Sequence, residues 1–566
     1  RKSSKRWAII MHAPPRPDFV LFLTDSWRAD HTFSARVPLT PFGINELSAD
    51  SNAWKLRKTA ETLLAAANYK DGLTTTLQLP AMEKMARQGT IFAHAYSASP
   101  LCSPSRRTFL QGRDYDAAKP APQGCFMDQR WLSLEPTLYS ELAMTGYNVL
   151  HAGITFAHSA YRGNGRTPRD AWLNASEWTI HNQMTTKARG PRPVCPDLTT
   201  DRFIQWLDHH PVCDKGGYMA FVDYYTQRGS YVPRPATSAN KAQIDVMQLD
   251  GIDRGACGLP ISHQLDSFIV ASGLRLWRNR TEGIPAFLEF DLTGPHPPAL
   301  MLRRRSGKLC TYEYGVVHFE RCRYAAHVEE TDRLLGLVLH EIPPTKNTLL
   351  LTSSDHGEML WDHGVEAKTQ PWEGSIAVPM IVAGLDVRRN AVMHDPVFLP
   401  DLTTTILDFA GVRHTALPTM NAVSLRPLLT GVEANAEVPE KLGPHSHPRG
   451  NHSNHLHNVR IVRVGFANWR VVLTRIHGRL FKLISGYQYQ QRHVLMLFDL
   501  DVDAHEDSPR NASTCTLGKW LEQQMSPKVG PGMARGYTTV PRGLTLSMAE
   551  CANLSSSGRV FRGNLG

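Results

Sequence analysis

Residues 101–113 read LCSPSRRTFLQGR, in which one cysteine is followed by a proline and two arginines. Beside this much positive charge, Cys102 could be a thiolate nucleophile with a lowered pKa, half of a disulfide or a metal ligand. It could also be the precursor of a different group made after synthesis. The residue types in this stretch leave all four chemistries open.

Two acidic positions lie far apart in the sequence, and each follows a short apolar run. Asp25 ends the run DFVLFLT at residues 18–24, and Asp355 with His356 follows the run that begins at Thr348. Both runs have the composition of a buried parallel strand, and open α/β sheets place their ligand sites at the carboxyl ends of such strands. The two strand ends therefore predict a site for a hard divalent cation.

Helical and strand-like segments alternate around these two strands. The helical spacing covers residues 80–92, 137–149 and 324–342, and the strand-like runs cover residues 218–225, 286–292 and 378–384. This alternation predicts an α/β sheet that is covered by helices on both faces.

The length of 566 residues is too great for one ordinary core. Residues 32–78 and 160–260 lack regular periodicity and are interpreted as insertions. Beyond residue 430 the chain changes character, from a His-rich stretch without zinc-ligand spacing at 442–458 to short β-like runs. We expect a catalytic domain over 1–430 and a smaller C-terminal subdomain with an antiparallel sheet over 431–566.

The net charge of +10 favours an anionic substrate or polymer. Zinc-finger, RNP-like and bZIP patterns are missing from the sequence, so nucleic acid is not an expected partner, and no apolar run is long enough for a membrane span. A targeting segment is not visible. Eight further cysteines could pair: Cys125, Cys195, Cys213, Cys257, Cys310, Cys322, Cys515 and Cys551. Sequons for N-glycosylation stand at Asn174, Asn279, Asn451, Asn511 and Asn553.

The Cys102 stretch resembles a known family signature. CSPSRRTFLQGR matches the sulfatase pattern C-x-P-S-R-x-x-x-L-x-G-R. Further similar segments follow the family order: FLTDSWRADH, TGPHPP, SDHGEMLWDHG, KTQPWEGSIAVPMIV, LPDLTTTILDFAGV, SLRPLLTG and LFDLDVDAHEDSPRN. The chain thus resembles the formylglycine-dependent type I sulfatases of the alkaline-phosphatase superfamily, and loosely the iduronate sulfatases and arylsulfatases.

The resemblance implies an alkaline-phosphatase-like α/β fold with a mixed central sheet between helices. It also implies that a formylglycine-generating enzyme converts Cys102 to formylglycine (3-oxoalanine). The hydrated aldehyde attacks sulfur with one hydroxyl, and its second hydroxyl later expels sulfate. One calcium ion is held by Asp25, Asp355, His356 and the residue at position 102.

The remaining site residues also follow from the resemblance. Arg106 supports the hydrated aldehyde, and Lys368 binds a sulfate oxygen, standing five residues before Glu373 as in the family pattern K-x-x-x-x-E. His296 contacts the ester or protonates its leaving oxygen. His158 lies near the position of a further family histidine. The location implied is secreted or lumenal, in the lysosome, the endoplasmic reticulum or outside the cell.

Three features depart from the family pattern. Ser26 follows Asp25 where a second acidic or amide residue is usual, and Ile154 stands at the position of a sulfate-binding lysine. In addition, residues 201–235 and 263–298 both resemble the segment that carries the family histidine. Only the second retains that histidine, at His296, and we assign the motif there.

The function expected is the hydrolysis of sulfate esters, on a sulfated glycan or a small sulfate ester. Two alternatives stay open. One is a phosphodiester or phosphonate monoester hydrolase of the same fold, and the other is a catalytically silent protein that binds sulfated ligands.

Overall fold

The fold is described from a computed structural model of the chain. The described residues are 16–33, 36–38, 74–118, 136–153, 265–296, 304–307, 310, 316–412, 420–431, 458–489, 492–493, 495–525, 536–541 and 543–554. Several sequence predictions therefore lie outside the described residues: the insertion at 160–260, most of the insertion at 32–78, the strand-like run 218–225, the histidines of 442–457, Ile154 and His158.

A seven-stranded mixed sheet forms the centre of the molecule, with the order β11-β4-β10-β8-β1-β7-β6. Its strands are β1 (Asp18–Asp25), β4 (Gly89–Phe92), β6 (Asn148–Gly153), β7 (Ala286–Pro295), β8 (Thr348–Ser354), β10 (Met380–Gly384) and β11 (Ala391–Met393). β6, β7, β1 and β8 run parallel, whereas β10 is antiparallel to both of its neighbours. The two apolar runs that end in acidic residues are thus adjacent parallel strands, as predicted.

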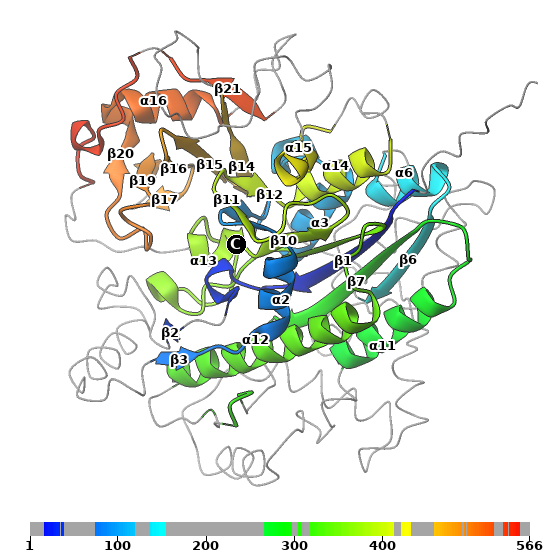
Figure 1. Cartoon of the computed structure of the whole chain (residues 1–566). Helices are drawn as coiled ribbons and strands as arrows, with labels where there is room; N and C mark the ends of the chain where they lie inside the picture. Colours follow the sequence, from blue (N-terminus) through cyan, green and yellow to red (C-terminus); the bar gives the residue numbers. More distant parts are fainter. Residues whose placement is uncertain are drawn as a thin grey trace, which may run out of the picture.

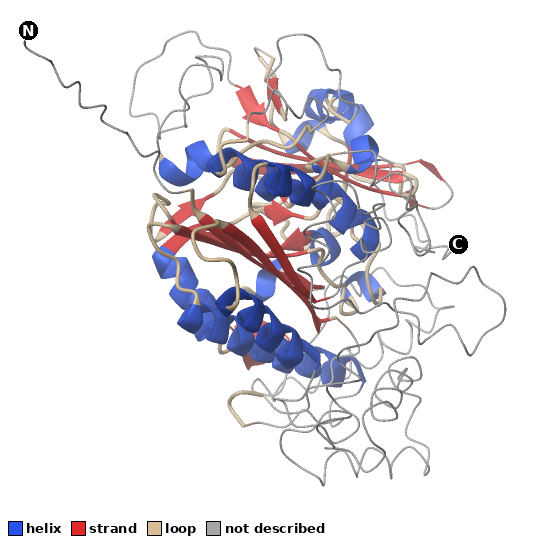
Figure 2. Cartoon of the chain, turned by 90° about the vertical axis from the view of Figure 1, so that its right-hand side faces the viewer, coloured by secondary structure: helices blue, strands red, loops and turns tan. Residues whose placement is uncertain are grey.

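Helices cover both faces of this sheet (Figures 1 and 2). One face packs against α2 (Pro80–Gln88), α11 (Leu265–Arg278) and α12 (Val316–Glu341), and the other against α3 (Cys102–Gln111), α6 (Leu138–Met144) and α14 (Pro400–Phe409). Along β1, Phe19 and Leu21 enter one hydrophobic core while Val20 and Phe22 enter the other. A strand buried on both faces carries apolar residues at every position, which explains the unbroken run in the sequence.

Two predicted helices end earlier than their periodicity indicates. The helix expected at 80–92 stops at Gln88, because Gly89 adopts an extended backbone and begins β4. A Cβ at position 89 would lie 2.2 Å from the carbonyl oxygen of Val382, so the close approach of the strands requires glycine. The helix expected at 137–149 ends at Met144, and Gly146 with a φ of 83° turns the chain into β6.

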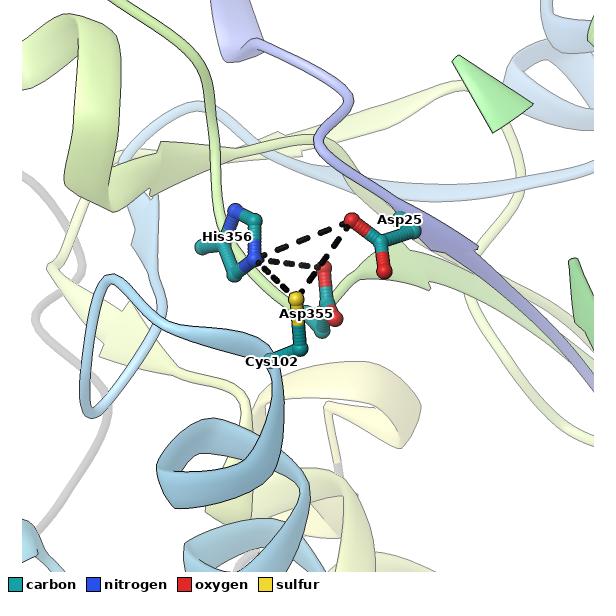
Figure 3. Close-up of side chains that lie close together, drawn as sticks. All are labelled: Asp25, Cys102, Asp355 and His356. Carbon is teal, nitrogen blue, oxygen red and sulfur yellow. Dashed lines mark hydrogen bonds and ion pairs between the residues drawn. The ribbon is translucent and has the colours of Figure 1, made fainter. Parts of the chain in front are cut away.

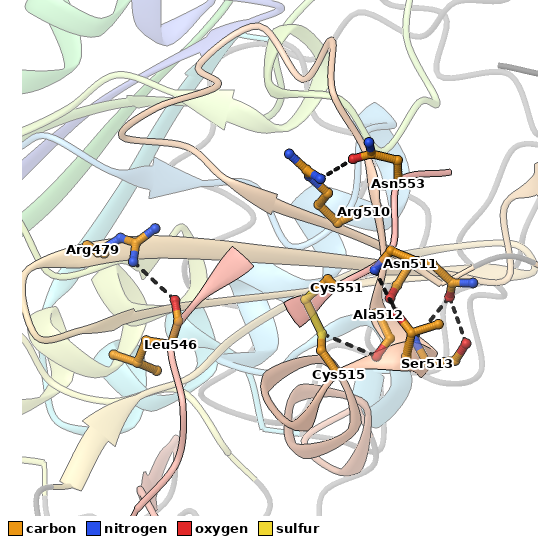
Figure 4. The surroundings of a disulfide bond; sticks show 11 residues. Arg479, Arg510, Asn511, Ala512, Ser513, Cys515, Leu546, Cys551 and Asn553 are labelled. Carbon is orange, nitrogen blue, oxygen red and sulfur yellow. Dashed lines mark hydrogen bonds between the residues drawn. A yellow bond between two sulfur atoms is a disulfide. The ribbon is translucent and has the colours of Figure 1, made fainter. Parts of the chain in front are cut away.

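The C-terminal region contains the predicted antiparallel sheet. Its five strands are β14 (Val462–Phe466), β15 (Trp469–Ile476), β16 (Arg479–Ser485), β19 (Met496–Asp499) and β20 (Arg510–Asn511). Beside it, α16 (Thr516–Gln523) begins next to Cys515, which forms a disulfide with Cys551 (Figure 4). The sheet shares one hydrophobic cluster with Tyr96, Trp372 and Phe398 of the central region. The domain boundary at residue 430 stays a prediction.

Smaller elements complete the described structure. They are β2 (Arg36–Pro38) with β3 (Thr74–Thr76), the three-stranded sheet of β12 (Val397–Phe398), β5 (Ala95–Tyr96) and β9 (Ala377–Val378), β13 (Asn458–Arg460) with β21 (Tyr537–Thr539), β17 (Gln488–Tyr489) with β18 (Arg492–His493), and the short helices α4 (Tyr115–Ala118), α13 (Glu373–Ile376) and α15 (Arg426–Thr430). A second disulfide joins Cys310 to Cys322. Among the described helices, none combines the length and apolar character that crossing a membrane requires.

Candidate active site and metal centre

The carboxyl ends of β1 and β8 bring three of the predicted ligands together. Asp25 is the last residue of β1, and Asp355 and His356 directly follow β8. Thr24 is paired with Ser354 across the two parallel strands, so the acidic side chains that follow emerge at the same edge of the sheet. All three side chains are buried.

Cys102 faces this edge from the first residue of α3 (Figure 3). Its Sγ lies 3.1 Å from His356 Nε2 and 3.8 Å from Asp25 Oδ1. Four potential ligand atoms lie within 4.8 Å of one another, one each from Asp25, Cys102, Asp355 and His356. The structure thus brings together the four residues that the sequence predicts to surround a cation.

The orientation of His356 suits a metal ligand. Its Nδ1 lies 2.8 Å from the carbonyl oxygen of Gly357, which makes Nδ1 the protonated nitrogen and leaves the Nε2 lone pair facing the carboxylates. Nε2 lies 3.7 Å from Asp25 Oδ1 and 3.6 Å from Asp355 Oδ1. These separations are too long for hydrogen bonds, and two ligands of one ion have a similar spacing.

Ser26 orders the two carboxylates instead of joining them as a ligand. Its hydroxyl donates to Asp25 Oδ1 at 2.9 Å, and its backbone N–H donates to Asp355 Oδ1 at 3.2 Å. The residue adopts a φ of 69°, which is uncommon for a non-glycine residue. The sequence analysis identified Ser26 only as a departure from the family pattern and missed this positioning role.

Arg106 lies among three buried carboxylates. Its Nε donates to Asp355 Oδ2 at 3.0 Å, its Nη1 donates to Asp291 Oδ1, and its Nη2 lies 3.5 Å from Asp25 Oδ2. A guanidinium group can bind several acceptors at once because its donors form a rigid planar fork. Arg106 is therefore held at the edge of the cation site, one helical turn beyond Cys102.

Lys368 and His296 approach Cys102 from the partly exposed side of the site. Lys368 Nζ lies 3.0 Å from Cys102 Sγ, 2.8 Å from His296 Nε2 and 3.2 Å from His356 Nε2. His296 directly follows β7, and it comes from the second of the two segments that resemble the family motif. The sequence analysis assigned the family motif to residues 263–298, and the structure places the histidine of this segment beside the other predicted site residues.

The two carboxyl groups of the cation site have opposite pKa shifts. Burial acts to raise the pKa of Asp25, but the positive charge of Lys368 and of neighbouring groups outweighs it and lowers that pKa below the usual range. Burial and the charge of Asp25 raise the pKa of Asp355 to about 7. A bound divalent cation would favour ionisation of both carboxyls. Burial and the charge of Lys368 lower the pKa of His356, so its imidazole is neutral.

Cys102 itself is not a good thiolate. Burial and the charge of Asp25 raise the pKa of its thiol well above the usual range, despite the nearby lysine and arginine. The residue also lies outside any disulfide. Two of the four chemistries considered for this cysteine, a low-pKa nucleophile and half of a disulfide, thus disagree with its surroundings.

A buried ion cluster holds the segment that carries Lys368. Glu373 Oε1 accepts from Lys482 Nζ at 2.8 Å, and the backbone N–H of Glu373 donates to Glu506 at 2.7 Å. Lys482 and Glu506 are themselves 2.7 Å apart. Because Lys482 belongs to β16, the C-terminal sheet anchors a segment of the candidate active site.

Three further polar residues were missed by the sequence reasoning. His151, Glu289 and Asp291 form a second buried group near Arg106, on β6 and β7. The available signal was the run AFLEFDL, in which two acidic residues stand two positions apart on a strand that is otherwise apolar. His158, by contrast, lies outside the described residues, so its assignment stays a prediction.

Comparisons with known proteins agree on one family and one fold. The sulfatase family model matches residues 17–412. Arylsulfatase K of Gallus gallus is 26% identical over 401 residues, which cover 68% of this chain and 68% of the relative.

Solved structures give the same result for the fold. A phosphonate monoester hydrolase from Silicibacter pomeroyi superimposes with a TM-score of 0.54 at 16% identity, over 90% of this chain and 94% of its own. A protein in complex with its substrate D-glucosamine-2-N,6-O-disulfate gives a TM-score of 0.51 at 14% identity, over 90% and 97%. The mixed central sheet between helices is thus the alkaline-phosphatase-like fold.

Proposed function

The chain belongs to the sulfatase family, the sulfuric ester hydrolases, and from this premise we propose that it acts through a formylglycine formed from Cys102, beside one bound calcium ion. The observation that carries the proposal is the position of Cys102. It begins a buried helix, and its Sγ lies 3.0 Å from Lys368 Nζ and 3.1 Å from His356 Nε2. The sulfur atom marks where an oxygen of the converted residue would stand.

The surroundings of Cys102 favour conversion over a role as a thiol. The raised pKa keeps the thiol protonated and therefore weakly nucleophilic. A hydrated formylglycine would supply two hydroxyl groups on one carbon, one to accept the sulfuryl group and one to expel it. Hydroxyl oxygens also match the hard carboxylate oxygens of Asp25 and Asp355 better than a soft sulfur does.

Asp25, Asp355, His356 and the residue at position 102 would hold the calcium ion. The two buried carboxylates and the lone pair of His356 fit a divalent cation, although imidazole is a less usual ligand of calcium. When bound, the ion would offset the negative charge of the sulfate and favour ionisation of a hydroxyl at position 102.

The cationic side chains around Cys102 would bind and orient the sulfate group. Arg106 is fixed by its carboxylate partners, so its charge is in place before the substrate arrives. Lys368 Nζ would donate to a sulfate oxygen. Burial acts to lower the pKa of this lysine, but the adjacent Cys102 and the carboxylate of Asp25 raise it above the usual range, so the ammonium form persists.

His296 is the group best placed to give a proton to the leaving oxygen. Its Nε2 lies 2.8 Å from Lys368 Nζ, and the ring is partly exposed, on the side from which a substrate can approach. In the structure Nε2 is placed to accept a hydrogen bond from the Lys368 ammonium. Once Lys368 donates to a sulfate oxygen instead, Nε2 would be able to take up a proton from solvent and give it to the alkoxide as the bond between sulfur and oxygen breaks. The described residues Arg106, Lys368 and His296 thus divide charge stabilisation and proton transfer among them.

We further propose that the substrate is a sulfated glycan and that the protein acts in a secretory lumen or outside the cell. The net charge of +10 favours a polyanion. The two disulfides and the exposed sequon residues Asn279 and Asn553 fit maturation in an oxidising lumen. In such a compartment the chain would also meet a formylglycine-generating enzyme.

Mass spectrometry of the tryptic peptide that contains position 102 tests the conversion. We expect the aldehyde, or its hydrate, in protein from the native source, and the unmodified thiol would contradict the proposal. The matched control is Cys102→Ser, in which the same peptide carries no aldehyde.

Substrate selectivity separates the alternatives. We expect turnover of aryl sulfates and desulfation in a screen over heparan, chondroitin and algal glycans, with both lost in Cys102→Ala. Faster turnover of aryl phosphate or phosphonate esters would favour the phosphonate hydrolase. This is the second candidate because Ile154 stands at the position of a sulfate-binding lysine in the family pattern. Converted protein with no turnover of any ester would show a silent binding protein.

A further inference from the structure

A second group of buried metal-ligand side chains lies behind Arg106. His151 on β6 is paired in register with Glu289 on β7, and Asp291 follows two residues later, so all three side chains emerge on one face of the sheet. None of the three is more than 3% exposed. Burial separates this group from the exposed acidic clusters that are common on protein surfaces.

The spacing within the group is that of ligands and not of hydrogen-bond partners. His151 Nε2 lies 3.6 Å from Asp291 Oδ2, and this nitrogen has no hydrogen-bond partner among the described residues. One atom from each of the three side chains lies within 4.8 Å of the others. His356 and Asp355 at the first site show the same separation of 3.6 Å. Ligands of one ion stand at about this distance when each lies ~2.1 Å from the metal.

The buried charges around the group call for a further cation. The single charge of Arg106 is shared among Asp25, Asp291 and Asp355. Glu289 receives a hydrogen bond from the hydroxyl of Tyr139, which is a neutral donor. Burying carboxylates without a cationic partner is costly.

We propose that His151, Glu289 and Asp291 bind a second divalent cation, a transition metal of the zinc type. One imidazole and two carboxylates are a mixed nitrogen and oxygen set that satisfies zinc, which is usually four-coordinate. Calcium takes six to eight oxygen ligands, and this group lacks the additional oxygens that the converted residue 102 would supply at the first site. This site is additional to the calcium site of the proposed function and does not depend on the conversion of Cys102.

The second cation has a consequence for the proposed reaction. Asp291 would bind the metal through Oδ2 while Oδ1 accepts from Arg106. The metal would thus fix the orientation of Asp291, and Asp291 would fix the guanidinium group of Arg106. In this arrangement His151 and Glu289 are metal ligands that support the active site without touching the substrate.

Metal analysis of the full-length protein tests the proposal. The purified protein is stripped with a chelator, incubated with Zn²⁺ and Ca²⁺ together, passed through gel filtration and analysed by elemental mass spectrometry. We expect one retained equivalent of zinc in the wild type, and its loss in His151→Ala and in Glu289→Gln. The matched control Asp25→Asn changes a ligand of the first site and no ligand of the second, and it is expected to retain the zinc.

A second readout guards against variants that fail to fold. Co²⁺ can replace zinc, and its visible absorption bands depend on its ligands. Paramagnetic resonance or X-ray absorption of the Co²⁺-loaded wild type then shows whether an imidazole nitrogen coordinates the ion. This measurement needs only the folded wild type. A zinc equivalent that survives in both folded variants, or a wild type that takes up neither Zn²⁺ nor Co²⁺, would overturn the proposal. The three residues would then be a hydrogen-bonded network without a metal.

Discussion

Lys482 Nζ, on a strand of the C-terminal sheet, lies 2.8 Å from Glu373 Oε1. Glu373 stands five residues beyond Lys368, the lysine that we propose binds the sulfate group. Two more contacts join the same regions: Trp469 Nε1 donates to the carbonyl oxygen of Thr369, and the Tyr487 hydroxyl donates to Gln370. The C-terminal sheet thus helps to hold the Lys368 segment in place.

Replacing Lys482 with methionine is therefore expected to destabilise the protein and to reduce activity. The change leaves Glu506 buried without its cation, which costs roughly 3–5 kcal/mol of unfolding free energy. Denaturant unfolding measures the loss, and the matched control Lys346→Met removes an exposed lysine. If both variants unfold at the same denaturant concentration, the cluster does not anchor this segment.

Lys368 and His296 are expected to act as a coupled pair. Removing a preorganised cation from an active site typically lowers kcat by ~10²–10³-fold, and we expect this for Lys368→Met on an aryl sulfate. Because Lys368 Nζ lies 2.8 Å from His296 Nε2, the double variant with His296→Gln should lose less than the product of the two single losses. Fully multiplicative losses would show that the two side chains act independently, and circular dichroism controls for folding.

The cluster of Asp25, Cys102, Asp355 and His356 was predictable from the sequence because its signals are local. Asp25 and Asp355 each follow an apolar strand directly, and parallel strands place such ends together by a general rule. The ends of the helices at Gln88 and Met144 were not predictable from periodicity, since the apolar residues of the next strand continue the helical pattern.

The second group of ligands shows where sequence reasoning fails. His151 and Glu289 are far apart in the chain, and only the pairing of β6 with β7 places them in register. A single histidine in a strand is more often a core residue than a ligand. The acidic residues of β7 were visible in the sequence, but their partners depended on strand order, which local patterns do not determine.

The Cys515–Cys551 disulfide is expected to stabilise the C-terminal region more than the Cys310–Cys322 disulfide stabilises its own loop. The two bonds close loops with sequence separations of 36 and 12. Chain entropy in the unfolded state predicts losses of about 4 and about 3 kcal/mol when each pair is replaced by serines. Thermal unfolding of the two double variants measures the order, and a larger loss for the shorter loop would contradict the entropic explanation.

His363 is expected to make the stability of the protein depend on pH. Its ring stacks on Trp372 with centroids 4.6 Å apart, and burial lowers its pKa to about 4. In the unfolded chain the pKa of histidine is about 6.5. Between these pH values the unfolded state binds a proton that the folded state does not bind. The contribution of the neutral ring to the free energy of unfolding is therefore fully present above pH ~6.5 and is lost as the pH falls towards ~4.

The variant His363→Asn removes this titration and tolerates the φ of 53° at this position. We expect the stability difference between wild type and variant to shrink by roughly 2–3 kcal/mol as the pH falls from 7 to 4, allowing for the solvent-facing part of the ring. Denaturant unfolding at several pH values measures it. His477→Asn, at an exposed position with a φ of 48°, controls for losing an imidazole from this backbone conformation. A difference that stays constant with pH would show that His363 is protonated equally in both states.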